Sequence, residues 1–221
     1  MVVIACASRG LFVMSAAALV SATLAWSPAR AHAKEDLGPM AKLRRTEAEI
    51  RAAVSRRVPD WSPEADMRTR QIDRLLGALL DYDAIANQAL GAAFSTLAPA
   101  RRHDFIATFA ALTRRTFVTR LENQKLRTSY DGETIEGSEA RVTATTCAMG
   151  AAPETGSRIE YRLERKENDW RITDVIVDGT SLVATYKRQF RKLVAREGMD
   201  GLMVRMRDQL ASADRTDRPG R

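Results

Sequence analysis

The sequence has 221 residues, of which 45% are hydrophobic and 29% charged, and it carries a formal net charge of +7. This length suits one globular domain with appendages. No group of cysteines and histidines has the spacing of metal ligands, and no glycine-rich phosphate-binding loop is present. We therefore expect neither a bound metal nor another cofactor.

The N-terminal segment has the features of a secretory signal peptide. Arg9 supplies a positive charge before the uncharged apolar stretch 11–26, and Ala31 and Ala33 are small residues where a signal peptidase reads the chain. We expect cleavage after Ala33. The alternative is an uncleaved membrane anchor, for which the apolar stretch is shorter than the roughly 20 residues of a spanning helix.

Removal of residues 1–33 lowers the formal net charge to +5 and leaves one cysteine, Cys147, and one histidine, His103. An exported chain with one cysteine forms no internal disulfide. A catalytic Ser-His-Asp or Cys-His site would need His103, which lies in a polar segment and is expected to be an exposed surface residue.

The first half of the remaining chain predicts helices. We expect one helix over residues 37–58 and a second that begins at Pro63, with Ser62 as its N-cap. The second helix has apolar residues at helical spacing, namely Ile72, Leu75, Leu76, Leu79 and Leu80. A short helix over residues 84–90 should end at Gly91.

The longest amphipathic pattern follows Pro99 and contains an aromatic stripe. Its apolar positions are Phe105, Ile106, Phe109, Leu112, Phe117, Val118 and Leu121. Spacing alone favours ordinary core packing for this stripe over a ligand pocket.

Strand patterns begin after Asn123. Residues 125–130 and 135–137 flank Asp131 and Gly132, a pair that favours a tight hairpin turn. We therefore expect the first hairpin to turn at this pair.

Two further segments, 141–149 and 158–164, alternate as strands do. One face of the second segment is apolar and consists of Ile159, Tyr161 and Leu163. This is the pattern of a strand with one wet face and one buried face. With residues 170–177, these segments predict an antiparallel meander.

The segment 170–177 is apolar on both sides, which predicts a central place in the sheet. Trp170, Ile172 and Ile176 would share one face, and Val175 and Val177 the other. Asp174 falls on the first of these faces, so it needs a partner, either an arginine or backbone N–H groups.

The stretch after this strand has two interpretations. In the first, Asp178 and Gly179 form a turn, and Thr180 or Ser181 caps the next helix. The Asp178 carboxylate would then interact favourably with the positive end of that helix's dipole. In the second, Asp174, Asp178 and Ser181 belong to an active site.

The rest of the chain predicts two C-terminal helices separated at Gly198, followed by a disordered tail over residues 211–221. The elements together predict an α+β domain over residues 34–210. It would consist of N-terminal helices, a twisted antiparallel sheet of about four strands, and C-terminal helices that enclose a hydrophobic interior. The sequence leaves open whether this interior closes as a core or remains a pocket.

Four stretches in this order resemble the MlaC family, the periplasmic substrate-binding component of the Mla (maintenance of lipid asymmetry) transport system, also known as toluene-tolerance auxiliary proteins. They are residues 82–91, residues 97–105 with Phe109, residues 170–183, and residues 186–190 with residues 198–202. The third stretch, with its Trp-Arg-Ile-Thr-Asp-Val and Asp-Gly-Thr-Ser-Leu-Val segments, is similar to the family's most characteristic block. The chain departs from the family pattern at Phe94, Asp178 and Thr180, where tryptophan, glutamate and an aliphatic residue are usual.

The resemblance implies a soluble periplasmic carrier that binds the acyl chains of a phospholipid in a deep hydrophobic pocket and shuttles lipid between the outer and inner membranes. The implied partners are an outer-membrane lipoprotein complex and an inner-membrane ABC transporter with an MCE-domain protein. We also expect transient contact with the membrane surface, and we expect no binding of nucleic acid. Some relatives are associated with hopanoids, so another lipid is an alternative cargo.

For the pocket lining we expect apolar residues from both the helices and the sheet, about half of which would be ordinary core. These are Leu79, Phe105, Phe109, Leu112, Val142, Ile159, Tyr161, Val175, Val177, Leu182, Tyr186 and Phe190. The basic residues Lys187, Arg188 and Arg191 could meet a headgroup or a partner protein, although a solvated helix face is the simpler interpretation.

Two other classes compete with the carrier. A small cone-shaped enzyme would use Asp174 as general base with Tyr161 or Tyr186. An adaptor protein would have no pocket at all. Bound lipid would support the carrier, and a small polar pocket around Asp174 would support the enzyme.

Overall fold

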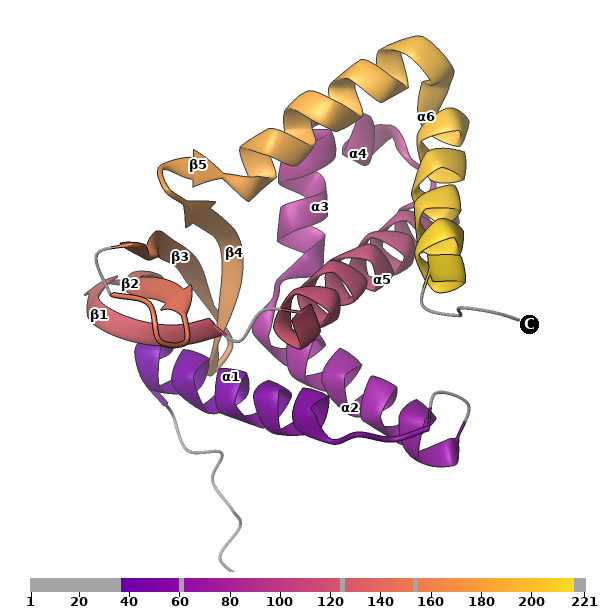
Figure 1. The fold of residues 1–221 in the computed structure, drawn as a ribbon. Helices are drawn as coiled ribbons and strands as arrows, with labels where there is room; N and C mark the ends of the chain where they lie inside the picture. Colours follow the sequence, from indigo (N-terminus) through magenta and orange to yellow (C-terminus); the bar gives the residue numbers. More distant parts are fainter. Residues whose placement is uncertain (1–36, 60–61, 124–125, 153–154, 217–221) are drawn as a thin grey trace, which may run out of the picture. The chain divides into compact units, whose positions relative to one another are not determined.

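The computed structural model describes residues 37–59, 62–123, 126–152 and 155–216. These residues fall within one unit of the chain (Figure 1). The expected signal peptide, residues 1–33, lies outside the described part. Among the described helices, none is long and apolar enough to cross a membrane.

Helices occupy the first half of the described chain, as the sequence predicts. They are α1 (Pro39–Ser55), α2 (Pro63–Leu79), α3 (Tyr82–Leu90), α4 (Ala92–Thr96) and α5 (Pro99–Asn123). The Ser62 hydroxyl accepts a hydrogen bond from the Ala65 N–H at 3.2 Å, which confirms it as the N-cap of α2. Gly91 ends α3 with a positive φ of 58°, and the short helix α4, which the sequence did not predict, starts directly after it.

The second half contains a five-stranded antiparallel sheet in the order β1-β2-β3-β4-β5. The strands are β1 (Leu126–Glu136), β2 (Glu139–Ala148), β3 (Ser157–Lys166), β4 (Asp169–Val177) and β5 (Thr180–Ser181). The predicted meander is therefore confirmed, with a two-residue fifth strand in addition. Because β4 lies between β3 and β5, it is paired on both sides at its C-terminal end.

The first hairpin turns at a different place from the one predicted. Strand β1 continues through Asp131 and Gly132, and its register with β2 shifts between Tyr130 and Gly132, so Asp131 is a β-bulge. The Asp131 carboxylate accepts a hydrogen bond from the Thr145 hydroxyl at 2.9 Å, which holds the bulge against β2. The chain reverses instead at Gly137, which has a φ of 61°.

A second bulge corrects the predicted faces of β4. Arg162 pairs with Asp174 but Leu163 pairs with Ile172, so Thr173 is the extra residue. Beyond it, Val175 pairs with Tyr161 and Val177 with Ile159. Residues directly opposite in an antiparallel pair share a face. The two valines therefore lie on the face of Ile172, and Asp174 and Ile176 lie on the other.

The C-terminal segment α6 (Leu182–Thr216) consists of two helices joined at Gly198, where φ is 71° and ψ is −178°. This confirms the predicted separation. The helix continues to Thr216, whereas we predicted a disordered tail from residue 211; the last part of that tail, residues 217–221, lies outside the described residues.

Buried apolar side chains of the described residues form three clusters rather than one. The helical cluster comprises Ile85, Ala86, Ala89, Phe94, Phe105, Phe109, Val183, Phe190, Leu202, Met203 and Met206. The sheet cluster comprises Leu43, Leu79, Ala140, Val142, Leu163, Trp170 and Ile172, and the α1–α2 cluster comprises Ile50, Ala53, Ile72 and Leu76. Half-buried Leu80, between α2 and α3, packs against all three and marks where they meet.

One buried ammonium group ties three elements together. Lys42 of α1 donates to the Ala78 carbonyl at 2.8 Å, to the Trp170 carbonyl at 2.5 Å and to the Asp169 carboxylate at 2.7 Å. Because the charge is paired and hydrogen-bonded, burial is tolerated. These hydrogen bonds hold α1 and the end of α2 against the start of β4.

Candidate functional site

The junction between β4 and α6 is built by local hydrogen bonds. Asp178 and Gly179 have φ values of 49° and 78°, the positive values that a tight hairpin turn of the primed type requires. Of the two predicted cap residues, Ser181 is the one that caps α6, because its hydroxyl accepts from the Ala184 N–H at 3.0 Å. The Asp178 carboxylate accepts from the Arg158 N–H at 2.8 Å, so it secures the turn to β3.

Asp174 belongs to the same junction. One carboxylate oxygen accepts from the backbone N–H groups of Val175 (2.8 Å) and Val183 (3.2 Å), and the other accepts from the Ser181 hydroxyl at 2.7 Å. Of the two predicted kinds of partner, backbone N–H groups are therefore the ones present. A buried carboxylate with three donors joins the strand to the helix.

A polar pocket of about 350 Å³ lies beside Asp174 on the outer face of the sheet. Its lining includes Thr173, Asp174, Arg162, Glu164 and Gln88. Neither tyrosine of the enzyme hypothesis lines it, because Tyr161 lies on the opposite face of the sheet and Tyr186 packs on the helical cluster. The acid and tyrosine of that hypothesis are therefore not assembled at this pocket.

The predicted lipid-binding residues fall into two groups, and the first lies in the helices. Phe105, Phe109 and Phe190 are buried in the helical cluster, with Leu112 and Tyr186 half-buried at its border. The rings pack edge to face, with centroids 5.1 Å apart for Phe109 and Tyr186 and 5.7 Å for Phe105 and Phe190. The three phenylalanines are thus buried in the helical cluster, and Leu112 and Tyr186 are partly exposed at its border.

The second group lies on the inner face of the sheet. Leu79 and Val142 are buried in the sheet cluster, and Tyr161 and Val175 are half-buried at its border. Beyond this border, the paired residues Ile159 and Val177 continue the same apolar face outside the cluster and are also half-buried.

The last predicted residue, Leu182 at the start of α6, is 41% exposed and belongs to neither group. The structure therefore places five of the twelve predicted residues in the buried clusters and six at or beyond their borders, with Leu182 exposed.

The helices of the described chain make their main backbone contacts with the strands on either side of β3, while Leu163 of β3 is itself buried. Helix α1 packs against β1 and β2, and β4 packs against α2, α3 and α6, but no helix of the described chain has extensive contact with β3. Its apolar side chains nevertheless point to the side on which the helices lie, as the packing of Tyr161 with the sheet cluster shows. This is the arrangement expected of one wall of an apolar binding site.

Three tyrosines add aromatic surface to these borders. Burial raises the pKa of Tyr161, and the nearby Glu47 charge raises it further. Burial also raises the pKa of Tyr186 and, with the Asp73 charge, that of Tyr82. All three side chains are therefore neutral across the physiological pH range.

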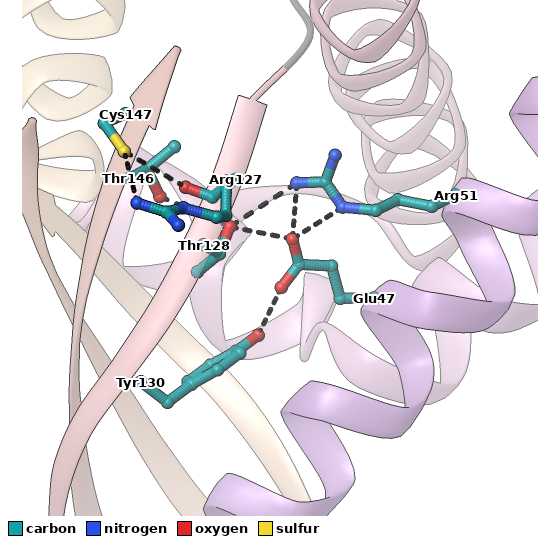
Figure 2. Close-up of polar contacts among 7 residues, drawn as sticks. All are labelled: Glu47, Arg51, Arg127, Thr128, Tyr130, Thr146 and Cys147. Carbon is teal, nitrogen blue, oxygen red and sulfur yellow. Dashed lines mark hydrogen bonds and ion pairs between the residues drawn. The ribbon is translucent and has the colours of Figure 1, made fainter. Parts of the chain in front are cut away.

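A polar network that the sequence analysis missed lies where α1 meets the free edge of β1 (Figure 2). One oxygen of the Glu47 carboxylate accepts from Arg51 at 2.6 and 2.9 Å and from the Thr128 hydroxyl at 2.7 Å. The other oxygen accepts from the Tyr130 hydroxyl at 2.6 Å. These residues line an open groove of about 630 Å³, which we name the α1–β1 groove.

The network also fixes charge and orientation. Burial would raise the pKa of Glu47, but hydrogen bonds from Tyr130, Arg51 and Thr128 outweigh it and lower that pKa below its usual value. The Tyr130 ring stacks on Tyr161, with centroids 6.5 Å apart, so the polar rim positions an aromatic residue of the inner face. In the sequence, only the four-residue spacing of Glu47 and Arg51 indicated part of this network.

Comparison with known proteins supports the interpretation of the fold. A search of curated proteins found no match. Among solved structures, a phospholipid-binding protein from Ralstonia solanacearum, determined in complex with a phospholipid, superposes with a TM-score of 0.64 at 20% identity. The match covers 80% of this chain and 99% of that one. The family model for the MlaC protein matches residues 48–208, most of the described chain, and this protein therefore belongs to the MlaC family.

Proposed function

We propose that this protein is a periplasmic carrier that binds the acyl chains of a phospholipid between the inner face of the sheet and the helices. The observation that carries the proposal is the apolar face of β3 and β4, which continues past the closed sheet cluster to the half-buried pair Ile159 and Val177. Membership of the MlaC family supports it, as does the phospholipid bound to the Ralstonia protein of the same fold.

The physical requirement for such a carrier is burial of the lipid's tails. Each methylene exposed to water costs about 0.8 kcal/mol, so a two-chain lipid does not cross an aqueous space alone. A carrier needs apolar surface that is reachable by a ligand and is not already consumed by core packing. We assign that surface to half-buried side chains at the cluster borders, namely Tyr82, Leu112, Tyr161, Val175 and Tyr186, together with Ile159 and Val177 beyond the sheet border.

The separate clusters favour a ligand in the interior. A domain with one continuous core has no room for acyl chains, because protein interiors are close-packed. Here the buried side chains of the described residues form separate helical and sheet clusters, with Leu80 packed against both. A lipid chain packed between the two borders would complete the burial of both.

The proposal extends to the route of the lipid. The N-terminal signal features favour export, and the family's role favours transfer between an outer-membrane lipoprotein complex and an inner-membrane ABC transporter with an MCE-domain protein. We propose phospholipid as the cargo in preference to a hopanoid, because the solved protein of this fold holds a phospholipid.

A vesicle-to-vesicle transfer assay with a fluorescent phospholipid tests this function. The variant Val177→Glu places a carboxylate on the half-buried end of the inner face, where it should fold yet exclude acyl chains. We expect at least a tenfold loss of transfer rate. The matched control is Val204→Glu in the second half of α6, the same substitution at a side chain that is 54% exposed, and it should transfer as the wild type does.

Two results would contradict the proposal. One is a wild-type protein that transfers no lipid, and the other is a folded Val177→Glu protein that transfers lipid at the wild-type rate. Phe109 is unsuitable for this test, because it is only 3% exposed and a charge there would unfold the helical cluster.

A further inference from the structure

The first half of α6 presents a row of cations to solvent. Lys187, Arg188, Arg191, Lys192 and Arg196 are all exposed, and residues 179–196 contain no aspartate or glutamate. We name these five residues the basic α6 face. On the opposite side of the same helix, Val183, Tyr186 and Phe190 pack on the helical cluster. This packing determines which side of α6 faces the solvent.

The charges on this face repel one another. Lys187 and Arg191 are four residues apart on the helix, as are Arg188 and Lys192, and like-charged pairs at this spacing destabilise a helix. Of these five residues, only Arg196 has an acidic partner among the described residues, namely Glu197 at 3.4 Å. The other four make no ion pair with a described residue. No acidic side chain of the described residues offsets the repulsion among these four, which favours an anionic partner outside the molecule.

Neighbouring elements extend the acid-free surface. Residues 84–103, which include most of α3 and all of α4, also lack aspartate and glutamate. Helix α3 packs against α6, and a side chain at Gly91 would lie 3.9 Å from the terminal methylene of Lys187. The basic α6 face is therefore bordered by neutral surface instead of by acidic residues that would screen it.

We propose that the basic α6 face docks the protein onto the anionic surface of a phospholipid bilayer. The inference rests on the proposed function in one respect, since a lipid carrier has to approach a bilayer or a bilayer-bound partner. It adds to that function the surface of contact and the chemistry of what it meets. Lysine and arginine near an anionic leaflet each strengthen binding by about fivefold.

The form of the face favours a lipid surface over an acidic protein. Its cations span about 14 Å along one straight helical segment, from the 1.5 Å rise per residue. None of these five residues lines the polar pocket beside Asp174 or the α1–β1 groove. A row of flexible cations on an exposed helix matches a plane of phosphates, which requires charge but no fixed geometry.

Co-sedimentation with vesicles tests the proposal on the full mature chain. Vesicles of equal parts phosphatidylglycerol and phosphatidylcholine are compared with pure phosphatidylcholine, at low and at high salt. We expect binding to the anionic vesicles that falls steeply with salt, and little binding to the neutral ones. The variant Lys187→Glu/Arg191→Glu/Lys192→Glu should bind the anionic vesicles at least about a hundredfold more weakly.

A matched control separates the face from the total charge. Arg57→Glu/Arg70→Glu/Arg74→Glu makes the same change in net charge on α2 and its approach, at three exposed arginines. In the described structure, none of the six substituted side chains has a hydrogen bond or an ion pair, so both variants should fold. The control should retain most of the wild-type binding.

Three outcomes would overturn the proposal. The first is an equal loss of vesicle binding in both variants, and the second is wild-type binding that does not depend on lipid charge. The third is binding to polyglutamate without binding to anionic vesicles. The last of these would assign the face to an acidic protein partner. Lipid content of the same preparations, measured by mass spectrometry, is read separately, so that an empty protein counts against the proposed function and not against the docking face.

Discussion

Asp174 is the buried carboxylate whose role decides between a structural junction and a catalytic site. It is 7% exposed and receives three hydrogen bonds, from Val175, Ser181 and Val183. An asparagine would replace one of the two carboxylate oxygens by an amide nitrogen, and the donor at that oxygen would lose its acceptor. The residue therefore stabilises the strand-to-helix connection, and its charge is offset by the donors around it.

We predict that Asp174→Asn lowers the free energy of unfolding by about 1–3 kcal/mol, because one donor would face an N–H group in place of an oxygen. Urea denaturation measures the change. Ser181→Ala, which removes the helix cap and one of the same hydrogen bonds, should cost about 1 kcal/mol. The double variant should cost less than the sum, since the two residues share a bond. An unchanged unfolding midpoint in Asp174→Asn would contradict this role.

Glu47 should make the free energy of unfolding depend on pH. Its pKa in the folded protein lies below the ordinary value of 4.5, so its network is fully present above about pH 4.5 and is lost as the pH falls below that value. We predict that the unfolding free energies of wild type and Glu47→Gln differ at pH 7 and converge toward pH 3. Glu49→Gln, at a half-exposed side chain whose partner Arg45 is on the same helix, should leave stability nearly unchanged at every pH. A difference for Glu47→Gln that persists undiminished at pH 3 would contradict the assignment.

At the scale of elements, the helices followed from local signals and the strand registers did not. Ser62 with Pro63, Gly91 and Gly198 each mark a helix boundary by capping or backbone geometry that one residue dictates. The bulges at Asp131 and Thr173 depend on which residues the neighbouring strand places opposite them. That information comes from pairing across the sheet, and a single strand's alternation does not contain it.

The break in α6 is the clearest element-level test. Gly198 has φ 71° and ψ −178°, a backbone region that is nearly confined to glycine. We predict that Gly198→Ala costs about 1–3 kcal/mol and lowers Tm by several degrees, measured by calorimetry. Gly77→Ala, in the interior of α2 with open space around it, should instead stabilise by about 0.5–1 kcal/mol. Equal effects at the two positions would show that the break does not need glycine.

At the scale of the whole molecule, the described chain divides its apolar residues among three clusters. Sequence periodicity identified Phe105, Phe109 and Phe190 as inward-facing, but it did not distinguish closed core from a border that a ligand can reach. That distinction depends on which helix covers which strand, as with β3 and its half-buried Ile159 and Tyr161. The sequence also did not predict the contacts of Glu47 with Thr128 and Tyr130, because these residues come from α1 and β1.

A lipid bound between the helical and sheet borders should also stabilise the folded protein. A ligand that binds only the native state stabilises it by RT ln(1 + [L]/Kd), which is about 2.7 kcal/mol at a hundredfold excess over Kd. We predict that removal of the lipid lowers Tm by several degrees and that addition of phospholipid restores it, as measured by calorimetry. The same treatment of Val177→Glu should change Tm little. An identical Tm before and after lipid removal from the wild type would count against an interior ligand.

Native mass spectrometry of the intact protein, purified from cells that export it, tests the central claim most directly. The account predicts a main species heavier than the mature chain by the mass of one phospholipid, which collisional activation releases as an identifiable lipid. It also predicts that this species disappears in Val177→Glu and persists in Val204→Glu. A wild-type protein found only at the mass of the bare chain, folded and without lipid, would contradict it.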